Sequence, residues 1–214
     1  MEVRKPRVVV GKKINDVLKN LEVELDPAKE VLIKPNLCCD LPEATTDPKI
    51  VEEVIHFLRE LGAKKISIVE SDNIGGTADE HFKALGYYDL SERNGVSLIN
   101  LTTYAKERGL DLFSVPDIIL NGQVVSINNM KTNDIGYVTL AGKNLLGLYP
   151  TPRKPRFHKS IDLVIEKLIE QTKPILAIID GYRGMDGPGS PLTGRMRNVG
   201  VIVGGTDVFS VDYV

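Results

Sequence analysis

Cysteine is scarce in this sequence: there are two in 214 residues, and they are adjacent, at Cys38 and Cys39. Neighbouring cysteines rarely bridge to each other without strain, so a disulfide framework is excluded. The reducing cytoplasm is therefore the expected compartment. Because no Cys-x-x-Cys spacing occurs, we do not expect an iron–sulfur cluster to be bound by this chain alone.

An excess of charge of either sign is also missing, since 27 Lys and Arg residues stand against 29 Asp and Glu residues, for a net charge of −2. This balance argues against a nucleic-acid partner, which calls for a basic excess. No apolar run approaches the roughly 20 residues of a membrane span, and no signal peptide is visible. With 42% hydrophobic residues, we expect one soluble globular domain over residues 1–214, with no membrane partner.

Apolar segments of strand length alternate with segments of helical spacing. The pattern predicts strands at 8–10, 31–33, 66–69, 96–101, 110–115, 124–128, 175–179 and 199–203, and helices at 14–21, 48–61, 77–85, 87–93, 139–148 and 161–169. This alternation is typical of an α/β fold with a largely parallel or mixed sheet and helices on both faces. Residues 102–128 break the rhythm and predict a small inserted hairpin, with a turn at Asn121-Gly122.

The clearest helix, at residues 48–61, carries signals at both of its ends. Asp47 suits the N-cap, Pro48 suits the first helical position and Gly62 suits the C-terminal cap. The apolar side chains between them repeat at helical spacing, so one face of this helix is expected to pack on the sheet. Strand, helix and strand with short links then predict a right-handed βαβ unit over residues 31–69.

Polar residues follow five of the predicted strands. These segments are Lys34-Pro35-Asn36, Glu70–Asn73, Asn128–Asn133, Asp180-Gly181 and Gly204–Asp207. Because the carboxyl ends of parallel strands meet at one edge of a sheet, ligands of such folds bind in the crevice at that edge. We therefore expect these polar groups to converge on a single ligand site.

The side chains expected at this edge are rich in cations and amide donors. The candidate ligand-binding residues are Lys34, Asn36, Thr45, Thr46, Asn144, Gly187 and Gly189, and the candidate catalytic residues are Lys131, Lys143 and His158. Charged donors, a helix N-terminus after Thr46 and a glycine-rich segment at 184–194 favour a carboxylate or phosphate, although that segment could equally form a lid. The alternative for each residue alone is a solvated lysine or a turn-forming asparagine.

Three aspartates are candidate ligands of a divalent cation, because hard ions bind carboxylate oxygens. They are Asp180, Asp207 and Asp212, and the alternative is that they form turns and helix caps. His158 could transfer protons near neutral pH, or it could be a surface residue of the basic stretch at 153–159. Cys38 and Cys39 are either reactive thiols or small buried hydrophobes.

A series of short motifs occurs in a fixed order along the chain. They are Lys34-Pro35-Asn36-Leu37, Ala44–Pro48, Leu61–Ile66, Glu70-Ser71, Met130-Lys131-Thr132, Thr139–Gly147, His158, Asp180-Gly181, Gly187-Pro188 and Gly205–Val208 with Asp212. In this combination the chain resembles the domain-of-unknown-function family numbered 362, from about Val31 to Asp212. The resemblance implies a bacterial or archaeal cytoplasmic protein of unsettled chemistry. Many such relatives carry ferredoxin-type modules or are described as iron–sulfur proteins.

The chain departs from this family pattern at one position. Asn133 stands where relatives usually have a histidine after the Lys-Thr pair, which puts an acid–base or metal role of that position in doubt. The family pattern also continues into a helix beyond the aspartate that matches Asp212. Because this chain ends soon after the strand at 199–203, we expect a domain truncated at its C-terminus.

Two functions of different classes are predicted from these features. The first is an enzyme of unspecified reaction that binds a small anionic molecule at the sheet edge, with no cofactor assigned beyond the candidate divalent cation. The alternative is a non-catalytic partner module that exchanges electrons with a ferredoxin-like protein in an iron–sulfur system. A homodimer is expected only from the general frequency of such assemblies.

Overall fold

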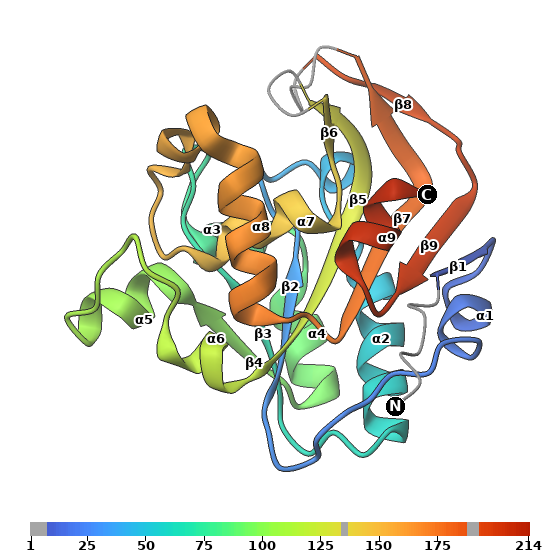
Figure 1. Cartoon of the computed structure of the whole chain (residues 1–214), viewed down its shortest axis with the longest axis horizontal. Coiled ribbons are helices and arrows are strands. Elements are labelled where there is room, and N and C mark those ends of the chain that lie inside the picture. Colours follow the sequence, from blue (N-terminus) through green and yellow to red (C-terminus); the bar gives the residue numbers. More distant parts are fainter. Residues whose placement is uncertain (1–7, 134–136, 188–192) are drawn as a thin grey trace.

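The computed structural model describes residues 8–133, 137–187 and 193–214. The strands of these segments form one mixed β-sheet. Across it run β1 (Val8–Gly11), β9 (Val201–Gly205), β7 (Leu176–Asp186), β5 (Gln123–Asn133), β2 (Val31–Pro35), β3 (Ile66–Glu70) and β4 (Ser97–Asn100), in that order (Figure 1). The five strands from β7 to β4 are parallel, whereas β1 and β9 are antiparallel to their neighbours. Two short strands extend this sheet: β6 (Tyr137–Thr139) pairs with β5, and β8 (Arg195–Arg197) pairs with β7.

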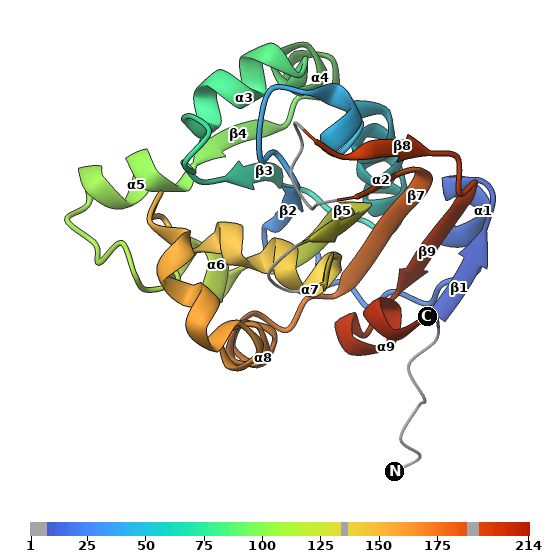
Figure 2. The same ribbon diagram turned by 90° about the horizontal axis from the view of Figure 1, so that it is seen from above.

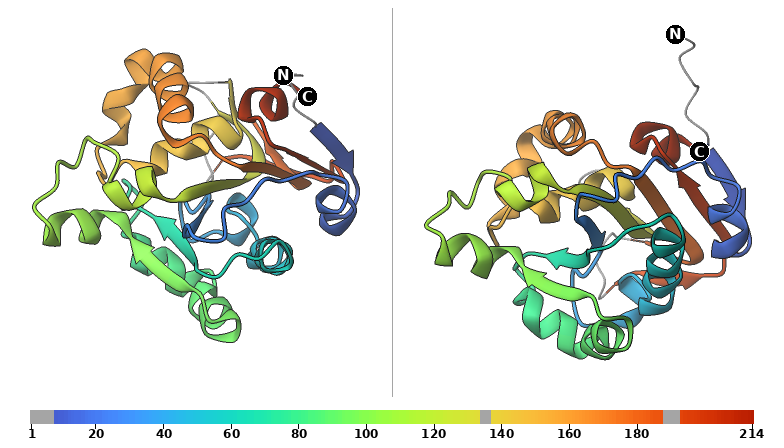
Figure 3. Two further views of the ribbon diagram at one scale, coloured as in Figure 1. Left: turned by 60° about the horizontal axis from the view of Figure 1, so that its bottom comes forward. Right: turned by 90° about the horizontal axis from the view of Figure 1, so that it is seen from below.

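Helices cover both faces of the sheet, as the sequence predicts. One face carries α1 (Ile14–Leu18), α2 (Pro48–Glu60), α3 (Ala78–Ala84) and α4 (Tyr87–Asn94). The other carries α5 (Leu101–Glu107), α6 (Asp117–Asn121), α7 (Ala141–Asn144), α8 (Ile161–Thr172) and α9 (Val208–Tyr213). Figure 2 shows these two layers on opposite sides of the strands, and Figure 3 shows the same layers from two other directions. The predicted α/β fold class is therefore confirmed.

The central strands are apolar on both sides because both of their faces are covered. In β2, Val31 and Ile33 belong to the core that contains α2, whereas Leu32, between them, packs into the core beneath α8. All five residues of β2 and all five of β3 are buried. This arrangement explains why the strands appear in the sequence as continuous apolar runs rather than alternating ones.

The ends of α2 are formed by the residues that the sequence indicates. The Asp47 carboxylate accepts a hydrogen bond from the backbone N–H of Lys49 at 2.9 Å, and Pro48 is the first helical residue. Gly62, just past the helix, has a φ of +97°, which a residue with a Cβ rarely adopts. Both ends of α2 are thus set by local chemistry.

Replacing the N-cap residue tests this local contribution. We expect Asp47→Ala to lower the free energy of unfolding by about 1 kcal/mol, because it removes the acceptor for an otherwise unpaired helix N–H. Urea denaturation measures the loss. The matched control is Asp89→Ala, at an exposed aspartate in the first turn of α4, which should change stability by no more than a few tenths of a kcal/mol. Equal losses in the two variants would contradict the capping role.

The inserted hairpin predicted over residues 102–128 is wrong. Residues 101–107 and 117–121 form α5 and α6, and Asn121-Gly122 ends α6 instead of turning between two strands. The physical reason lies partly in capping: the Asn100 side chain accepts hydrogen bonds from the N–H groups of Thr102 and Thr103, which starts a helix directly after β4. No helix in the described part of the chain is long and apolar enough to cross a membrane.

Candidate functional site

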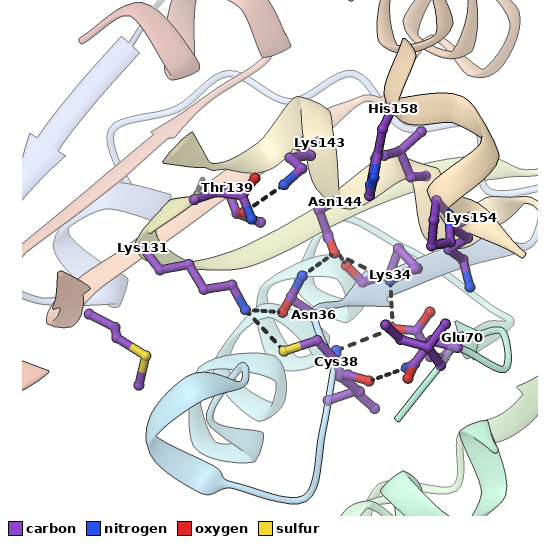
Figure 4. Close-up of a pocket in the computed structure, with 18 of the residues that line it drawn as sticks. Lys34, Asn36, Cys38, Glu70, Lys131, Thr139, Lys143, Asn144, Lys154 and His158 are labelled. Atoms are coloured by element: carbon purple, nitrogen blue, oxygen red, sulfur yellow. Dashed lines mark hydrogen bonds and ion pairs between the residues drawn. The ribbon is translucent and has the colours of Figure 1, made fainter. Parts of the chain in front are cut away.

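A pocket of about 310 Å³ lies at the carboxyl ends of β2, β3 and β5. Its described lining includes four lysines, one histidine, one cysteine and one carboxylate: Lys34, Lys131, Lys143, Lys154, His158, Cys38 and Glu70. The walls come from β2, β3, β5 and α7, together with the 3₁₀ turns η2 (Leu145–Leu148) and η3 (Lys154–Ser160) (Figure 4). The three lysines predicted to meet at this sheet edge, Lys34, Lys131 and Lys143, therefore do line one pocket.

Lys34 and Glu70 form a buried ion pair at the base of the pocket. The Lys34 Nζ lies 2.7 Å from Glu70 Oε2 and also donates to the Pro35 carbonyl at 2.6 Å and to Asn144 Oδ1 at 3.3 Å. Glu70 accepts further hydrogen bonds from the N–H groups of Leu37 and Ser71. Burial lowers the pKa of Lys34, and the Glu70 charge opposes that effect. All three N–H donors of Lys34 are thus used inside the protein.

Gly147 allows the turn η2 to approach this pair. A Cβ atom at this position would lie 2.6 Å from Glu70 Oε1 and closer still to the Lys34 Cε. The Ser71 hydroxyl also donates to the Gly147 carbonyl at 2.7 Å, which holds the two segments together. The glycine that ends the motif Lys143–Gly147 is therefore required by close packing against the ion pair.

Lys131 ties the loop after β2 to the sheet. Its Nζ donates to Asn36 Oδ1 at 2.7 Å, to the Ala44 carbonyl at 2.9 Å and to Cys38 Sγ at 3.2 Å. The pairing register of β5 with β7 shifts between Asn129 and Lys131, so a β-bulge immediately precedes this lysine. The sequence predicts that this strand ends at residue 128, but β5 continues to Asn133.

The two candidate asparagines link these groups to one another. Asn144 Nδ2 donates to the Lys34 carbonyl at 2.8 Å and to Ser126 Oγ at 3.1 Å, and its Oδ1 accepts from Asn36 Nδ2 at 3.2 Å. These amides hold Lys34, Asn36 and α7 in one network. Their donors face protein groups, so the asparagines position the pocket walls.

Lys143 and Lys154 retain donors for a ligand. Lys143 Nζ donates to Thr139 Oγ1 at 3.2 Å, and Lys154 Nζ donates to the Asp72 carbonyl at 2.6 Å, each of them a neutral partner. An ammonium group has three donors, so two remain on each lysine beyond these contacts. Burial lowers the pKa of both side chains to about 8, and for Lys143 the charge of Lys131 adds to this effect. Burial and the Lys143 charge lower the pKa of His158.

Three of the predicted site residues lie at a different pocket. Thr45, Thr46 and Asp180 line a second cavity of about 540 Å³ beside β7 and the start of α2. The Thr46 hydroxyl donates to the Ile127 carbonyl at 3.0 Å, and the Thr45 hydroxyl donates to the Leu41 carbonyl at 3.1 Å. The helix N-terminus that follows them already has the Asp47 carboxylate as its cap. The predicted single site is therefore divided between two cavities.

The glycine-rich segment is only partly accounted for by the structure. The Gly187 carbonyl accepts a hydrogen bond from Thr132 Oγ1 at 2.9 Å, and Gly187 is not among the lining residues of either pocket. Gly189 lies outside the described residues. Gly194, near the other end of the segment, does line the lysine-rich pocket.

The three aspartates predicted as a cation site do not come together. β9 runs antiparallel to β7, with Gly205 opposite Ala177 and Val201 opposite Gly181, so Asp207 lies at the sheet end opposite to Asp180. Each carboxylate accepts backbone N–H groups nearby: Asp180 from Tyr182, Asp207 from Ser210, and Asp212 from Ala141 and Gly142. Within the described ranges, no group of three or more His, Cys, Asp or Glu residues could hold a metal ion.

Three residues of the lysine-rich pocket are not among the individual site residues predicted from the sequence. Glu70 is predicted only as part of a motif and of the polar segment Glu70–Asn73, although a carboxylate that directly ends a buried strand signals a charge partner. Lys154 belongs to the basic stretch at 153–159, and its ammonium group is held by the Asp72 carbonyl at the pocket. For Cys38 the sequence allows a reactive thiol or a small buried hydrophobe, and the structure puts it on the pocket wall.

Comparisons with known proteins agree with the motifs. The family model described as "Domain of unknown function (DUF362)" matches residues 31–214. The "Thylakoid-associated protein sll1697" of Synechocystis sp. is 28% identical over 205 residues, which cover 88% of this chain and 62% of that protein. The chain thus spans less than two thirds of this relative's length. No solved structure gives a significant match. The match across nearly the whole chain establishes that the protein belongs to the domain-of-unknown-function family 362.

Proposed function

We propose that the lysine-rich pocket binds a small anion bearing a carboxylate or phosphate group, and that the protein is an enzyme acting on it. One observation carries the proposal: four lysines line the pocket against a single described carboxylate, Glu70, which is paired with Lys34. The charges of Lys131, Lys143 and Lys154 are left without a carboxylate partner among the described contacts. An anionic ligand would neutralise them in a site that is partly shielded from water.

The three lysines have different roles in this proposal. Lys143 and Lys154 hold the anion, because each has two N–H donors with no partner among the described residues beyond its one neutral contact. Each charge-assisted hydrogen bond of this kind contributes about 1.5–3 kcal/mol. Lys131 uses its three donors inside the protein and supplies positive potential from the wall.

Lys143 and His158 are the proposed proton-transfer groups. With a pKa of about 8, Lys143 exists in both protonation states near neutral pH, which a general base or acid requires. His158 has a lowered pKa, so its imidazole is mainly neutral at that pH and is able to accept a proton.

The cytoplasm remains our proposed compartment, since the two thiols are free.

An oxalate titration by calorimetry tests the binding site. We expect Lys143→Met to weaken oxalate binding by about tenfold or more, because the variant loses one charge-assisted hydrogen bond. Lys106→Met, at an exposed lysine on α5 that is not part of the pocket lining, is the matched control and should bind as the parent protein does. Undiminished binding in Lys143→Met would refute the proposed site. A tightly co-purifying iron–sulfur protein, with no oxalate binding, would favour the alternative of an electron-transfer module.

The affinity for oxalate should also depend on pH with a defined sign. Lys143 and Lys154 have pKa values of about 8, so both are charged below that pH and lose their charge as the pH rises through it. Oxalate stays fully ionised across this range, so we expect its affinity to be highest near pH 6.5 and to fall between pH 7.5 and 9. Lysines that titrate near their usual pKa of about 10.4 would instead leave the affinity constant to pH 9.

A further inference from the structure

Cys38 presents its sulfur to the same pocket. The half-buried Cys38 follows β2, and its Sγ lies 3.2 Å from Lys131 Nζ and 3.8 Å from the Sγ of Cys39. Cys38 is among the lining residues, whereas Cys39 is not. Figure 4 shows the Cys38 sulfur and the Lys131 ammonium group directed toward each other. The arrangement is a thiol paired with a cation at the wall of a cavity.

The surroundings of Cys38 favour its thiolate form. The hydrogen bond with the Cys39 thiol and the ammonium group of Lys131 lower the pKa of Cys38, and burial of the sulfur opposes them. The pKa of Cys39 is raised, because the same hydrogen bond favours its protonated form. Lys131 Nζ also donates a hydrogen bond to Cys38 Sγ, and this contact favours a negative charge on Cys38. A thiolate, not a thiol, is the nucleophile in cysteine chemistry.

The position of this sulfur relative to the proposed ligand suggests a reaction. The charge on Cys38 acts on Lys143, whose pKa it raises against the lowering effect of burial, so the two groups interact within one cavity. Lys143 and Lys154 would hold the anionic group of a ligand on one wall while Cys38 faces it from the loop after β2. Neither lysine forms an ion pair with a described carboxylate, so both remain available to the ligand.

We propose that Cys38 is the catalytic nucleophile of this pocket and attacks an electrophilic carbon of the bound anion. The proposal rests on the proposed function for the identity of the ligand. The substrate class is a small carboxylate- or phosphate-bearing molecule in which that carbon carries a leaving group. The thiolate electron pair forms the S–C bond, and the bond to the leaving group breaks with its electrons on that group. Protonated Lys143 supplies the proton that a basic leaving group takes up.

Alkylation of the full chain by one anionic and one neutral reagent tests this assignment. Iodoacetate carries a carboxylate and iodoacetamide is neutral, and both transfer a two-carbon group to a thiolate with release of iodide. Tandem mass spectrometry of the peptide containing both cysteines assigns the site. We expect Cys38 to be modified before Cys39. We also expect the ratio of the iodoacetate rate to the iodoacetamide rate to be on the order of tenfold higher for Cys38 than for free glutathione.

Variants separate the contributions of the thiolate and of the anion site. Lys143→Met should remove most of the preference for iodoacetate while leaving the iodoacetamide rate nearly unchanged. Lys131→Met should move the midpoint of the iodoacetamide rate–pH profile upward, and Lys131→Arg, which keeps the charge, should restore much of the shift. Circular dichroism melting of each variant identifies any loss of folding, and Lys106→Met serves as the control for both reagents.

The possible failures can be told apart. If the iodoacetamide rate at Cys38 has the pH midpoint of a free thiol, near 8.5, the assignment of Cys38 as the nucleophile is overturned, even if oxalate binds the pocket. A low midpoint with no preference for iodoacetate, together with no oxalate binding, would refute the proposed function and with it the substrate class inferred here. Protection of Cys38 by oxalate, together with the preference for iodoacetate, would support both proposals.

Discussion

Replacing Glu70 by leucine lowers the free energy of unfolding by about 3–5 kcal/mol, because it leaves the Lys34 ammonium group buried without its carboxylate. Lys34 is 1% exposed, and its other partners are the Pro35 carbonyl and the Asn144 amide oxygen, which carry no full charge. Urea denaturation at pH 7 measures the loss. This is the largest effect on stability that we expect from a single substitution in the pocket.

The double variant Lys34→Met/Glu70→Leu is the control for this prediction. Replacing both partners removes the unpaired charge, so most of the lost stability should return. If the double variant is as unstable as Glu70→Leu alone, the loss arises from packing rather than from the uncompensated charge. Equal stability of Glu70→Leu and the parent protein would contradict the role of the ion pair itself.

The stability of Glu70→Leu should also rise with pH. Burial lowers the pKa of Lys34 from its ordinary 10.5, and Glu70 is the main group that opposes this, so the variant should have a lower Lys34 pKa than the parent. Between that pKa and 10.5 the unfolded chain binds more protons than the folded one, and stability therefore increases with pH. Urea titrations from pH 7 to pH 10, compared with those of the double variant, should show this recovery only when Lys34 is present.

Substituting alanine for Gly147 is expected to lower the free energy of unfolding by about 3 kcal/mol and to abolish oxalate binding. The added Cβ would lie 2.6 Å from Glu70 Oε1 and would overlap the Lys34 side chain, so the ion pair or η2 must move. Gly147 is not among the glycines with a positive φ, so the expected loss is steric. Thermal melting and calorimetry measure the two effects.

Gly86→Ala provides the matched comparison for Gly147→Ala. Gly86 has a φ of +77° and no atom within 4 Å of a built Cβ, so alanine there should cost about 1–2 kcal/mol through backbone strain alone. Because Gly86 lies away from the pocket lining, oxalate binding should be unchanged. Loss of binding in Gly86→Ala would show that general destabilisation, rather than the position of the ion pair, controls the site.

Local sequence patterns predicted the elements that local chemistry controls. The helix α2 is bounded by Asp47, Pro48 and Gly62 as expected, because capping and a positive φ depend on a few neighbouring residues. The hairpin at 102–128 was predicted from two apolar runs and an Asn-Gly pair. The helix cap at Asn100 and the packing of Ile119 into the core beneath α8 outweigh that signal.

The candidate site was predictable where the strands are parallel. Lys34, Lys131 and Lys143 meet because β2 and β5 run in the same direction and α7 lies against β5. Asp207 does not join Asp180, because β9 is antiparallel to β7, and an apolar strand has the same sequence pattern in either direction. The sequence likewise gives no sign that Thr46 and Asp180 line a different cavity from the lysines.

The amino-acid sequence alone determined the family, the α/β class and the meeting of Lys34, Lys131 and Lys143 at one sheet edge, because motifs, hydrophobic periodicity and capping are local properties. Only the tertiary structure decided which of those lysines are free to bind a ligand. Lys34 and Lys131 use their donors on Glu70, Asn36 and the Ala44 carbonyl, and these pairings join positions far apart in the chain. A hydrogen bond requires its two atoms to lie within about 3 Å of each other, and sequence spacing does not specify that proximity.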